Sequence, residues 1–447
     1  MKILIAWALA AAFGSGAMTA AAADVSLSGF GTLGYAQSNQ PYNFERFINH
    51  NGTVARDSVA GVQVDAKFTE SVGATVQGKF APSTKNDSAW DGTLAWAFLS
   101  WRPANDLLIR LGKQRVSLYL YSESMDVGVT HDFARLPVEM YGSSPTTDYV
   151  GGSFSKTWAP DLGELTLDGY TGSTNTGFRY YQRDNVLVPG TNSVPGVNFS
   201  NFTYDGTGII LTLLRNEDRY RASAHSLSAT MAPGQRELSY TTLIQPADIG
   251  LINPQLAPVA GLVSGSAYTV LPQALLNKVT SQVFTLGAEI KLPQDFRFVG
   301  EYVRRKMTNA NLGLDSNGGY VSILKDIDQW TPYASFAVVK SKSAVLNLYK
   351  TVNANPGMTA LLPSPQLVGA VAQINAYQRI LADALAVYDQ NTIALGTSYR
   401  LTPKQKIKFE WARTHVGVAS SFVDAPAGGN VSNQNIDVLS FSYNFVF

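Results

Sequence analysis

Side chains that could support acid–base, nucleophilic or metal chemistry are few in this chain and widely separated. Its four histidines are His50, His131, His225 and His415, and their spacing matches no metal-ligand motif. The chain has no cysteine, which excludes disulfide bonds and thiolate chemistry, and it has no Gly-x-Ser-x-Gly segment. We therefore expect no metal and no cofactor. His225 with a neighbouring serine stays open as a hydrolytic pair, although no further motif selects it.

Charged side chains are the other candidates, and they are sparse. Charged residues make up 15% of the chain, below the usual quarter or so, while 45% is hydrophobic and 11% aromatic. The formal charge is +1, and it becomes 0 if Lys2 belongs to a removed leader, which argues against binding of nucleic acid. The acidic candidates lie close together in the sequence, and the basic candidates lie at intervals along the chain. They are Glu123, Asp126, Asp132 and Glu139, and Lys67, Lys79, Arg110, Arg221, Arg297, Arg305 and Lys408.

The segments that carry the basic residues alternate between apolar and polar side chains with the period of a β-strand. In "DSVAGVQVDAKFTESVGATVQGKF", Val62 and Val64 face one side, and Asp65 and Lys67 face the other. Charges in mid-strand are costly in a dry sandwich core unless they are paired, whereas a water-filled lumen hydrates them. No stretch after the leader reaches the roughly 18 apolar residues of a membrane helix. The pattern predicts an all-β protein, a transmembrane antiparallel β-barrel with one face in lipid and one in water.

Alternation of this kind predicts about sixteen strands. They are Val25–Ala36, Ala60–Phe68, Val72–Phe80, Gly92–Trp101, Leu107–Val116, Asp148–Trp158, Glu164–Gly172, Gly208–Leu214, Tyr220–Thr230, Gln282–Lys291, Phe296–Met307, Gly319–Lys325, Gln329–Lys340, Asn391–Leu401, Lys406–Val416 and Asn435–Phe447. The connections alternate between short turns and long loops, so that short periplasmic turns gather on one rim and long extracellular loops on the other. A sandwich gives no reason for this sorting.

The first residues are typical of a secretory leader. Lys2 supplies a positive start, and the apolar run Ile3–Phe13 is too short to span a bilayer as a helix. Small residues follow, with Ala21–Ala23 before Asp24. We therefore predict a signal peptide over residues 1–23 and a single exported barrel domain over residues 24–447.

Several segments give the chain a family resemblance. With the leader, "VSLSGFGTLGYAQ", "IRLGKQRVSLYLYSE", "DQWTPYASFAVVKS", "ALGTSYRLTPKQKIKFEWA" and the terminal "FSYNFVF" resemble Gram-negative outer-membrane porins, over essentially the whole mature chain and as a pattern. The resemblance implies passive diffusion of small hydrophilic solutes, a homotrimer, and contact with outer-membrane lipid and lipopolysaccharide. It also implies that the barrel-assembly machinery reads the last strand, with Phe447, Phe445 and Tyr443 as its signal. The alternative is that Phe447 only anchors the aromatic girdle.

Porins of this kind fold the loop after the fifth strand into the lumen as a constriction, and here that loop is Ser117–Thr147. Its carboxylates would oppose the basic side chains of the wall, and the resulting transverse field favours small, hydrated, dipolar solutes. Any one of these charged residues is best interpreted as a solvated residue of the lumen or rim. The set as a whole predicts a constriction. Arg110 is the clearest member because it lies between Ile109 and Leu111, and the opposite phase would place it in lipid at a cost of about 2–4 kcal/mol.

The loop Ser341–Gln390 departs from the usual porin pattern. Within it, "QLVGAVAQINAYQRILADALAVY" places Val371, Ile374, Leu381, Leu385 and Tyr388 at helical spacing, which predicts an extracellular helix. Such a helix would pack on its own loop, across the mouth or against a neighbouring subunit. A partly covered mouth favours a narrower channel, so a substrate-specific channel for anions or a carbon source stays open. Two further alternatives are an outer-membrane enzyme and a secreted β-sandwich binding module.

Overall fold

The computed structural model describes most of the chain that follows the predicted leader. The described residues are 24–143, 148–183, 196–231, 243–246, 268–271, 278–308, 315–353, 365, 383, 385–426, 429 and 431–447. The predicted signal peptide lies outside them.

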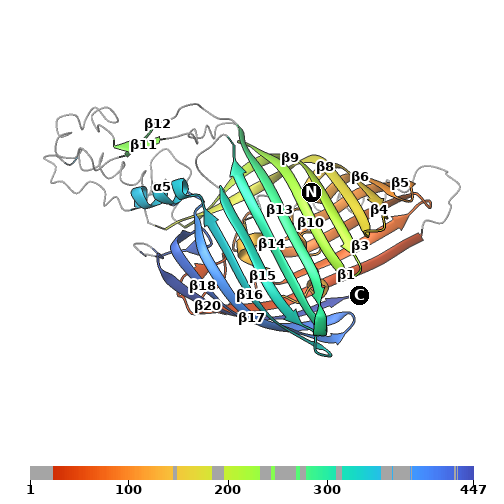
Figure 1. Cartoon of the computed structure of the whole chain (residues 1–447). Coiled ribbons are helices and arrows are strands. Elements are labelled where there is room, and N and C mark those ends of the chain that lie inside the picture. Colours follow the sequence, from red (N-terminus) through yellow and green to blue (C-terminus); the bar gives the residue numbers. More distant parts are fainter. Residues whose placement is uncertain are drawn as a thin grey trace.

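The wall of the molecule is a closed barrel of sixteen antiparallel strands, in which β1 pairs with β20 to complete the ring (Figure 1). The strands are β1 (Asp24–Ser38), β3 (Val59–Lys67), β4 (Val72–Pro82), β5 (Trp90–Ala104), β6 (Leu107–Arg115), β7 (Asp148–Trp158), β8 (Glu164–Gln182), β9 (Gly196–Arg215), β10 (Asp218–Met231), β13 (Lys278–Leu292), β14 (Phe296–Met307), β15 (Ser316–Lys325), β16 (Trp330–Ser341), β17 (Tyr388–Thr402), β18 (Gln405–Ser420) and β20 (Gln434–Val446). The predicted fold class is confirmed.

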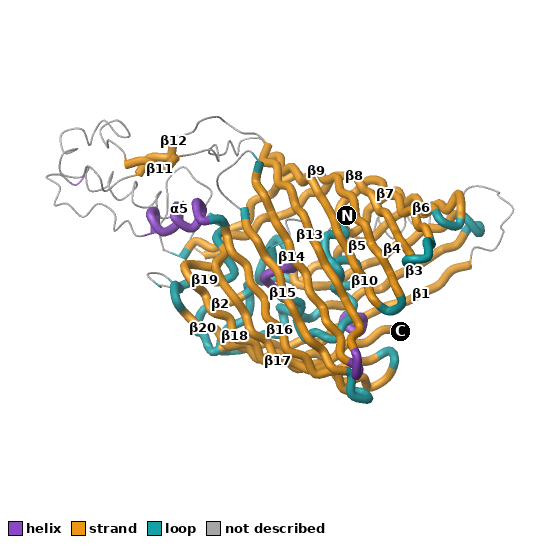
Figure 2. Tube along the Cα trace, viewed as in Figure 1, coloured by secondary structure: helices purple, strands orange, loops and turns teal. Residues whose placement is uncertain are grey.

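The remaining elements are short. Two small sheets pair β2 (Asn43–Phe44) with β19 (Val423–Asp424), and β11 (Leu243–Pro246) with β12 (Tyr268–Leu271). The helical segments with described bounds are η1 (Gly128–Thr130), α2 (Val138–Tyr141), η3 (Pro293–Asp295) and α5 (Ser343–Asn353), and Figure 2 shows α5 beyond the end of the barrel wall. Among the described residues, no helix is long and apolar enough to cross a membrane.

Apolar side chains point outward from the wall and stay uncovered. Leu27, Leu111, Leu286 and Leu439 are 65%, 60%, 60% and 61% exposed, although they lie on four different strands. The strand period places their neighbours on the lumen side. A belt of exposed aliphatic residues around a closed barrel is the surface that lipid covers, so the wall spans the membrane.

Neighbouring strands are joined by tight turns at the end of the barrel where the C-terminus lies (Figure 1). Asn216 has φ 55° and Asp328 has φ 53°, the left-handed conformation that Asn and Asp tolerate better than other side chains. These turn residues therefore allow the chain to reverse within a few positions.

Two strands are much longer than their apolar pattern predicted. The expected segments end at Gly172 and begin at Gly208, whereas the β8–β9 pairing continues to Gln182 and Gly196. Residues beyond the lipid need no apolar outward face, so the period that revealed the other strands fades there. The strand predicted at Gly319–Lys325 is confirmed as part of β15.

The helix predicted in the long loop is not tested over most of its length, because residues 366–382 lie outside the described set. Its expected end is corrected. Tyr388 is the first residue of β17, and Leu385 is buried against α5 residues such as Val345 and Leu346. These two apolar residues are therefore buried by tertiary contacts, and their helical spacing does not mean that a helix continues to Tyr388.

The pairing of β20 with β1 continues to Phe447, the residue after β20. Phe447 donates its backbone N–H to Gly29 at 3.0 Å, and the Gly29 N–H donates to the Phe447 carbonyl at 3.3 Å. The rings of Phe447 and Phe445 lie over Gly29 and Gly31 of β1, where a Cβ atom would collide with them. Glycine therefore makes room for the terminal aromatic rings.

Candidate pore constriction

Residues Val116–Ser143, here called the inner loop, fold into the barrel after β6. Leu118, Tyr119 and Leu120 are buried in one apolar cluster with Val283 of β13 and Val299 of β14. The loop therefore packs on the inside of the wall around β10–β16. The apolar run "LYLY" explains this position, since burying four large side chains is favourable.

A buried carboxylate holds the first part of the inner loop. Glu301 of β14 accepts hydrogen bonds from the Leu120 N–H at 2.8 Å, the Tyr320 hydroxyl at 2.8 Å and the Tyr141 hydroxyl. Arg305, on the same strand, is 1% exposed and donates to the Tyr119 hydroxyl and the Met140 carbonyl, both at 2.9 Å. Arg305 was expected to face the passage, but it lies beneath the inner loop and anchors it.

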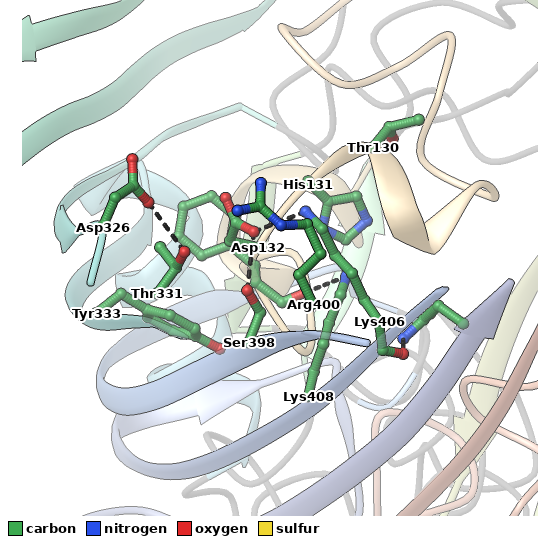
Figure 3. Close-up of polar contacts among 12 residues, drawn as sticks. Thr130, His131, Asp132, Asp326, Thr331, Tyr333, Ser398, Arg400, Lys406 and Lys408 are labelled. Carbon is green, nitrogen blue, oxygen red and sulfur yellow. Dashed lines mark hydrogen bonds and ion pairs between the residues drawn. The ribbon is translucent and has the colours of Figure 1, made fainter. Parts of the chain in front are cut away.

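Asp132 fixes the middle of the inner loop to the wall at β14, β17 and β18 (Figure 3). It accepts from Lys406 at 2.7 Å and from the Ser398 hydroxyl at 2.8 Å, and it pairs with Arg297. Burial raises the pKa of Asp132, but the charges of Lys406 and Arg297 outweigh this and hold it well below its usual range. Asp132 is therefore an ionised anchor.

Lys408 lies beside this anchor and is 1% exposed. Its ammonium group donates to the Phe133 carbonyl at 2.9 Å and lies 3.3 Å from Nδ1 of His131. Burial and the Lys408 charge lower the pKa of His131 well below its usual value, so this imidazole is neutral at pH 7. Lys408, like Arg305, positions the loop.

Asp126 forms the clearest opposed-charge contact between the inner loop and the wall. Its carboxylate accepts from Lys79 of β4 at 2.9 Å and pairs with Arg115 at the end of β6. Burial raises the pKa of Asp126, but Arg115 and Lys79 lower it further, to about 2. The three side chains line the cavity described below.

The other predicted site residues are spread over the lumen. Arg221 donates to the Ser117 carbonyl at 2.9 Å, and Glu123 accepts from the Ser117 hydroxyl at 2.8 Å. Arg110 lies over the Phe98 ring at 5.6 Å, on the lumen side as expected. Lys67 is exposed at the short-turn end of β3.

Glu139 has no cation as its hydrogen-bond partner in the described structure. It is 1% exposed and accepts from the Gln390 amide at 2.7 Å and from the Thr392 hydroxyl. Burial raises the pKa of this carboxyl group. Glu139 thus fastens α2 to β17 and presents little charge to a passing solute.

A cavity of about 580 Å³ lies between the inner loop and the uncovered part of the wall. Its lining extends from Arg183, just beyond the long-loop end of β8, to Asn444, two residues before the short-turn end of β20. The cavity therefore runs along most of the height of the barrel. The described part of the chain thus contains a cavity with many charged lining residues beside the packed inner loop.

Sequence reasoning missed several charged residues that line this passage. They are Arg46, Arg56, Arg115, Arg135, Arg179 and Arg183. Five of them lie in loops or in the unpredicted extension of β8, where no apolar alternation marks a lumen-facing phase. No sequence signal identified them, because their position depends on how distant loops pack.

Ser223 and His225 of β10 do form a hydrogen-bonded pair, at 2.7 Å. The other imidazole nitrogen contacts the Tyr170 hydroxyl at 3.0 Å, and the two residues are only 8% and 4% exposed. The Ser223 hydroxyl also faces the Leu118 carbonyl of the inner loop. This pair joins the loop to the wall and leaves no open serine for a substrate. The described residues contain no cluster of three potential metal ligands.

No family model matches this sequence, and no curated protein matches it. Solved structures do resemble it in fold. An outer-membrane-expressed OmpT of Vibrio cholerae has a TM-score of 0.49 at 11% identity, covering 96% of this chain and 99% of that one. An anion-selective porin from Comamonas acidovorans scores 0.48 at 11% identity, covering 95% and 100% of the two chains. The outer-membrane channel DcaP of Acinetobacter baumannii scores 0.48 at 12% identity, covering 96% and 100%. Similarity at this level describes the barrel and says nothing of the solute.

Proposed function

We propose that this chain forms a water-filled outer-membrane channel through which small hydrophilic solutes and ions diffuse passively. The observation that carries the proposal is the cavity that extends from Arg183 to Asn444 along the barrel interior. A barrel of sixteen strands is wide enough for an aqueous passage even with a loop folded inside it.

The anchoring of the inner loop supports a constriction of fixed shape. Glu301, Asp132 and Glu139 each fasten a different part of the loop to the wall. The passage is then bounded on one side by the loop and on the other by wall residues such as Lys79. Within the predicted set, we assign the direct influence on solutes to Asp126 and Lys79, which line the cavity, and the positioning role to Arg305 and Lys408.

The cellular setting is part of the same proposal. The exposed apolar belt fits a membrane, and the predicted leader over residues 1–23 fits export. We propose location in the outer membrane, insertion by the barrel-assembly machinery, contact with lipid and lipopolysaccharide, and assembly as a homotrimer.

Planar-bilayer conductance of the refolded mature chain tests the channel. Insertion should give discrete steps of current, and steps in groups of three would support the trimer. A protein that inserts and resists heat as a barrel, yet passes no current, would show that the cavity is not a passage.

A further inference from the structure

The long-loop end of the cavity contains an arginine that is held out by a strained turn. Glu45 and Arg46 have φ 48° and 75°, a backbone conformation that residues other than glycine rarely adopt. The turn is closed by two backbone hydrogen bonds between Phe44 and Ile48, at 2.8 and 3.0 Å. Both of these residues are buried, at 1% and 0% exposure, so the turn is fixed at its base.

The buried carboxylate of Glu45 holds this turn in its unusual conformation. Glu45, 5% exposed, accepts from Arg56 at 2.8 Å and also pairs with Arg135 of the inner loop. Its backbone N–H donates to the Phe422 carbonyl at 2.7 Å. Contacts from three separate segments therefore hold Glu45, the neighbour of Arg46 in the strained turn, which is typical of a functional position.

Arg46 keeps part of its guanidinium group available. Nε donates to Asp87 at 3.0 Å, and Nη2 donates to the Ser83 carbonyl at 2.8 Å. Nη1 has no partner among the described residues, and the side chain is 28% exposed in the cavity wall. A donor of this kind suits a carboxylate oxygen, because a charge-assisted N–H···O hydrogen bond is stronger than a neutral one.

The carboxylates of this region form ion pairs with the arginines. Asp87 bridges Arg46 and Arg179, and Asp424, 2% exposed, receives the other end of Arg179 at 2.9 Å. Among the described residues, seven exposed or partly buried cations line the cavity and six carboxylates pair with them. The cations are Arg46, Arg56, Lys79, Arg115, Arg135, Arg179 and Arg183, and the carboxylates are Glu45, Asp57, Asp87, Asp126, Asp383 and Asp424. Glu45, Asp57, Asp126 and Asp383 also line the cavity, so the cations there outnumber the carboxylates.

Aromatic rings share this end of the cavity with the arginines. Arg46 lies over the ring of Phe47 at 4.7 Å. Tyr388 and Phe422 form a ring pair at 4.8 Å, and Phe178 packs against the same cluster. All four rings line the cavity. Flat apolar surface beside a guanidinium donor matches a solute with a ring and a carboxylate.

We propose that this site, formed by Arg46, Phe47, Phe178, Tyr388 and Phe422, binds small aromatic carboxylates during their passage through the channel. The inference rests on the proposed channel function and names its solute class. The carboxylate pairs with Nη1 of Arg46, and the ring lies against the aromatic side chains.

Current block in planar bilayers tests the assignment, with benzoate as the probe. Benzoate should reduce the KCl current in a saturable manner, whereas acetate and benzyl alcohol at equal concentration should not. Arg46→Gln should weaken the block by about tenfold, the effect expected from loss of one charge-assisted contact. Phe47→Ala should bring benzoate close to acetate. Arg46→Lys should restore part of the block, because the positive charge remains while the Nη1 donor is lost.

Arg413→Gln is the matched control, because Arg413 is 53% exposed outside the cavity and pairs with Asp437. It removes the same charge and should leave the block unchanged. If the channel conducts but benzoate blocks no better than acetate, the solute assignment is wrong and the channel stands. If glucose blocks equally well and Arg46→Gln has no effect, the site is a saccharide site. Absence of any conductance would remove the channel and the solute site together.

Discussion

At the scale of single residues, charged side chains in this barrel divide into those that meet water and those that hold the inner loop. Arg305 and Lys408 have the inward phase of their strands, yet each is 1% exposed and donates to loop carbonyls. Asp126 differs because its ion pairs face the cavity. The position of a residue in the strand alternation decides only whether its side chain points inward, and not whether that side chain meets water.

Asp126→Asn should shift ion selectivity toward anions, because Lys79 and Arg115 lose the carboxylate that neutralises them. The pKa of Asp126 is depressed from 3.8 to about 2, so its charge and its stabilising contribution are present above about pH 4. Both are lost as the pH falls through about 2. The difference in reversal potential between the variant and the wild type should thus be constant from pH 7 to 4 and fall to about half near pH 2.

Asp437→Asn is the control for this experiment, since Asp437 pairs with Arg413 on the outer surface. It should leave the reversal potential unchanged. An equal shift from both variants would mean that Asp126 has no special place in the passage.

Glu301→Leu should destabilise the folded barrel, because it leaves the Leu120 N–H and two tyrosine hydroxyls without their acceptor. Each buried polar group without a partner costs about 1–3 kcal/mol. The midpoint of heat unfolding in detergent should fall, and proteolysis within the inner loop should become faster. Glu123→Leu, an exposed change on the same loop, should do neither. A stable, protease-resistant Glu301→Leu variant would show that apolar packing alone holds the loop.

At the scale of elements, the inner loop and the terminal strand have different determinants. The inner loop is held by contacts with partners far away in sequence, such as Glu301 with Leu120. The terminal strand is specified by its own alternation and by the glycines of β1 that accommodate its rings. Its pairing could therefore be predicted, whereas the loop contacts could not.

Phe447→Ala should reduce assembly of the barrel in cells more strongly than it reduces stability after refolding in detergent. The side chain is 57% exposed and adds little to the interior, while its backbone bonds to Gly29 survive the substitution. Heat-modifiable protein in outer-membrane fractions gives the first quantity, and unfolding of refolded protein gives the second. Phe441→Ala, 38% exposed on the same face, is the control. Equal effects of the two variants in cells would indicate a girdle role without a signal.

At the scale of the whole molecule, the exposed apolar belt decides how the barrel sits in a membrane. Ile393 and Leu395 of β17 are each 51% exposed, whereas Ala394 between them is 8% exposed. The same alternation recurs on strand after strand around the closed ring. The barrel wall thus carries an apolar belt on its outer face.

Leu395→Arg should destabilise the barrel in lipid by about 2–4 kcal/mol if this position lies near the bilayer centre. Refolding into phospholipid vesicles and unfolding in denaturant measure the change. Gln63→Arg, on the lumen side of β3, adds the same side chain and should cost far less. Equal costs would mean that the outer belt does not meet lipid.

The amino-acid sequence by itself determined the wall of this protein. A strand with apolar residues at every second position, such as "TIALGTSYR", has one face suited to lipid and one to water. Local periodicity therefore predicts sixteen strands and the inward phase of Arg110 and Lys79. The tertiary structure decided which inward charges remain in contact with water. The inner loop covers Arg305 and Lys408, and Arg46 reaches the cavity from a turn that is distant in sequence. These contacts join segments far apart in the chain, so no local sequence pattern could predict them.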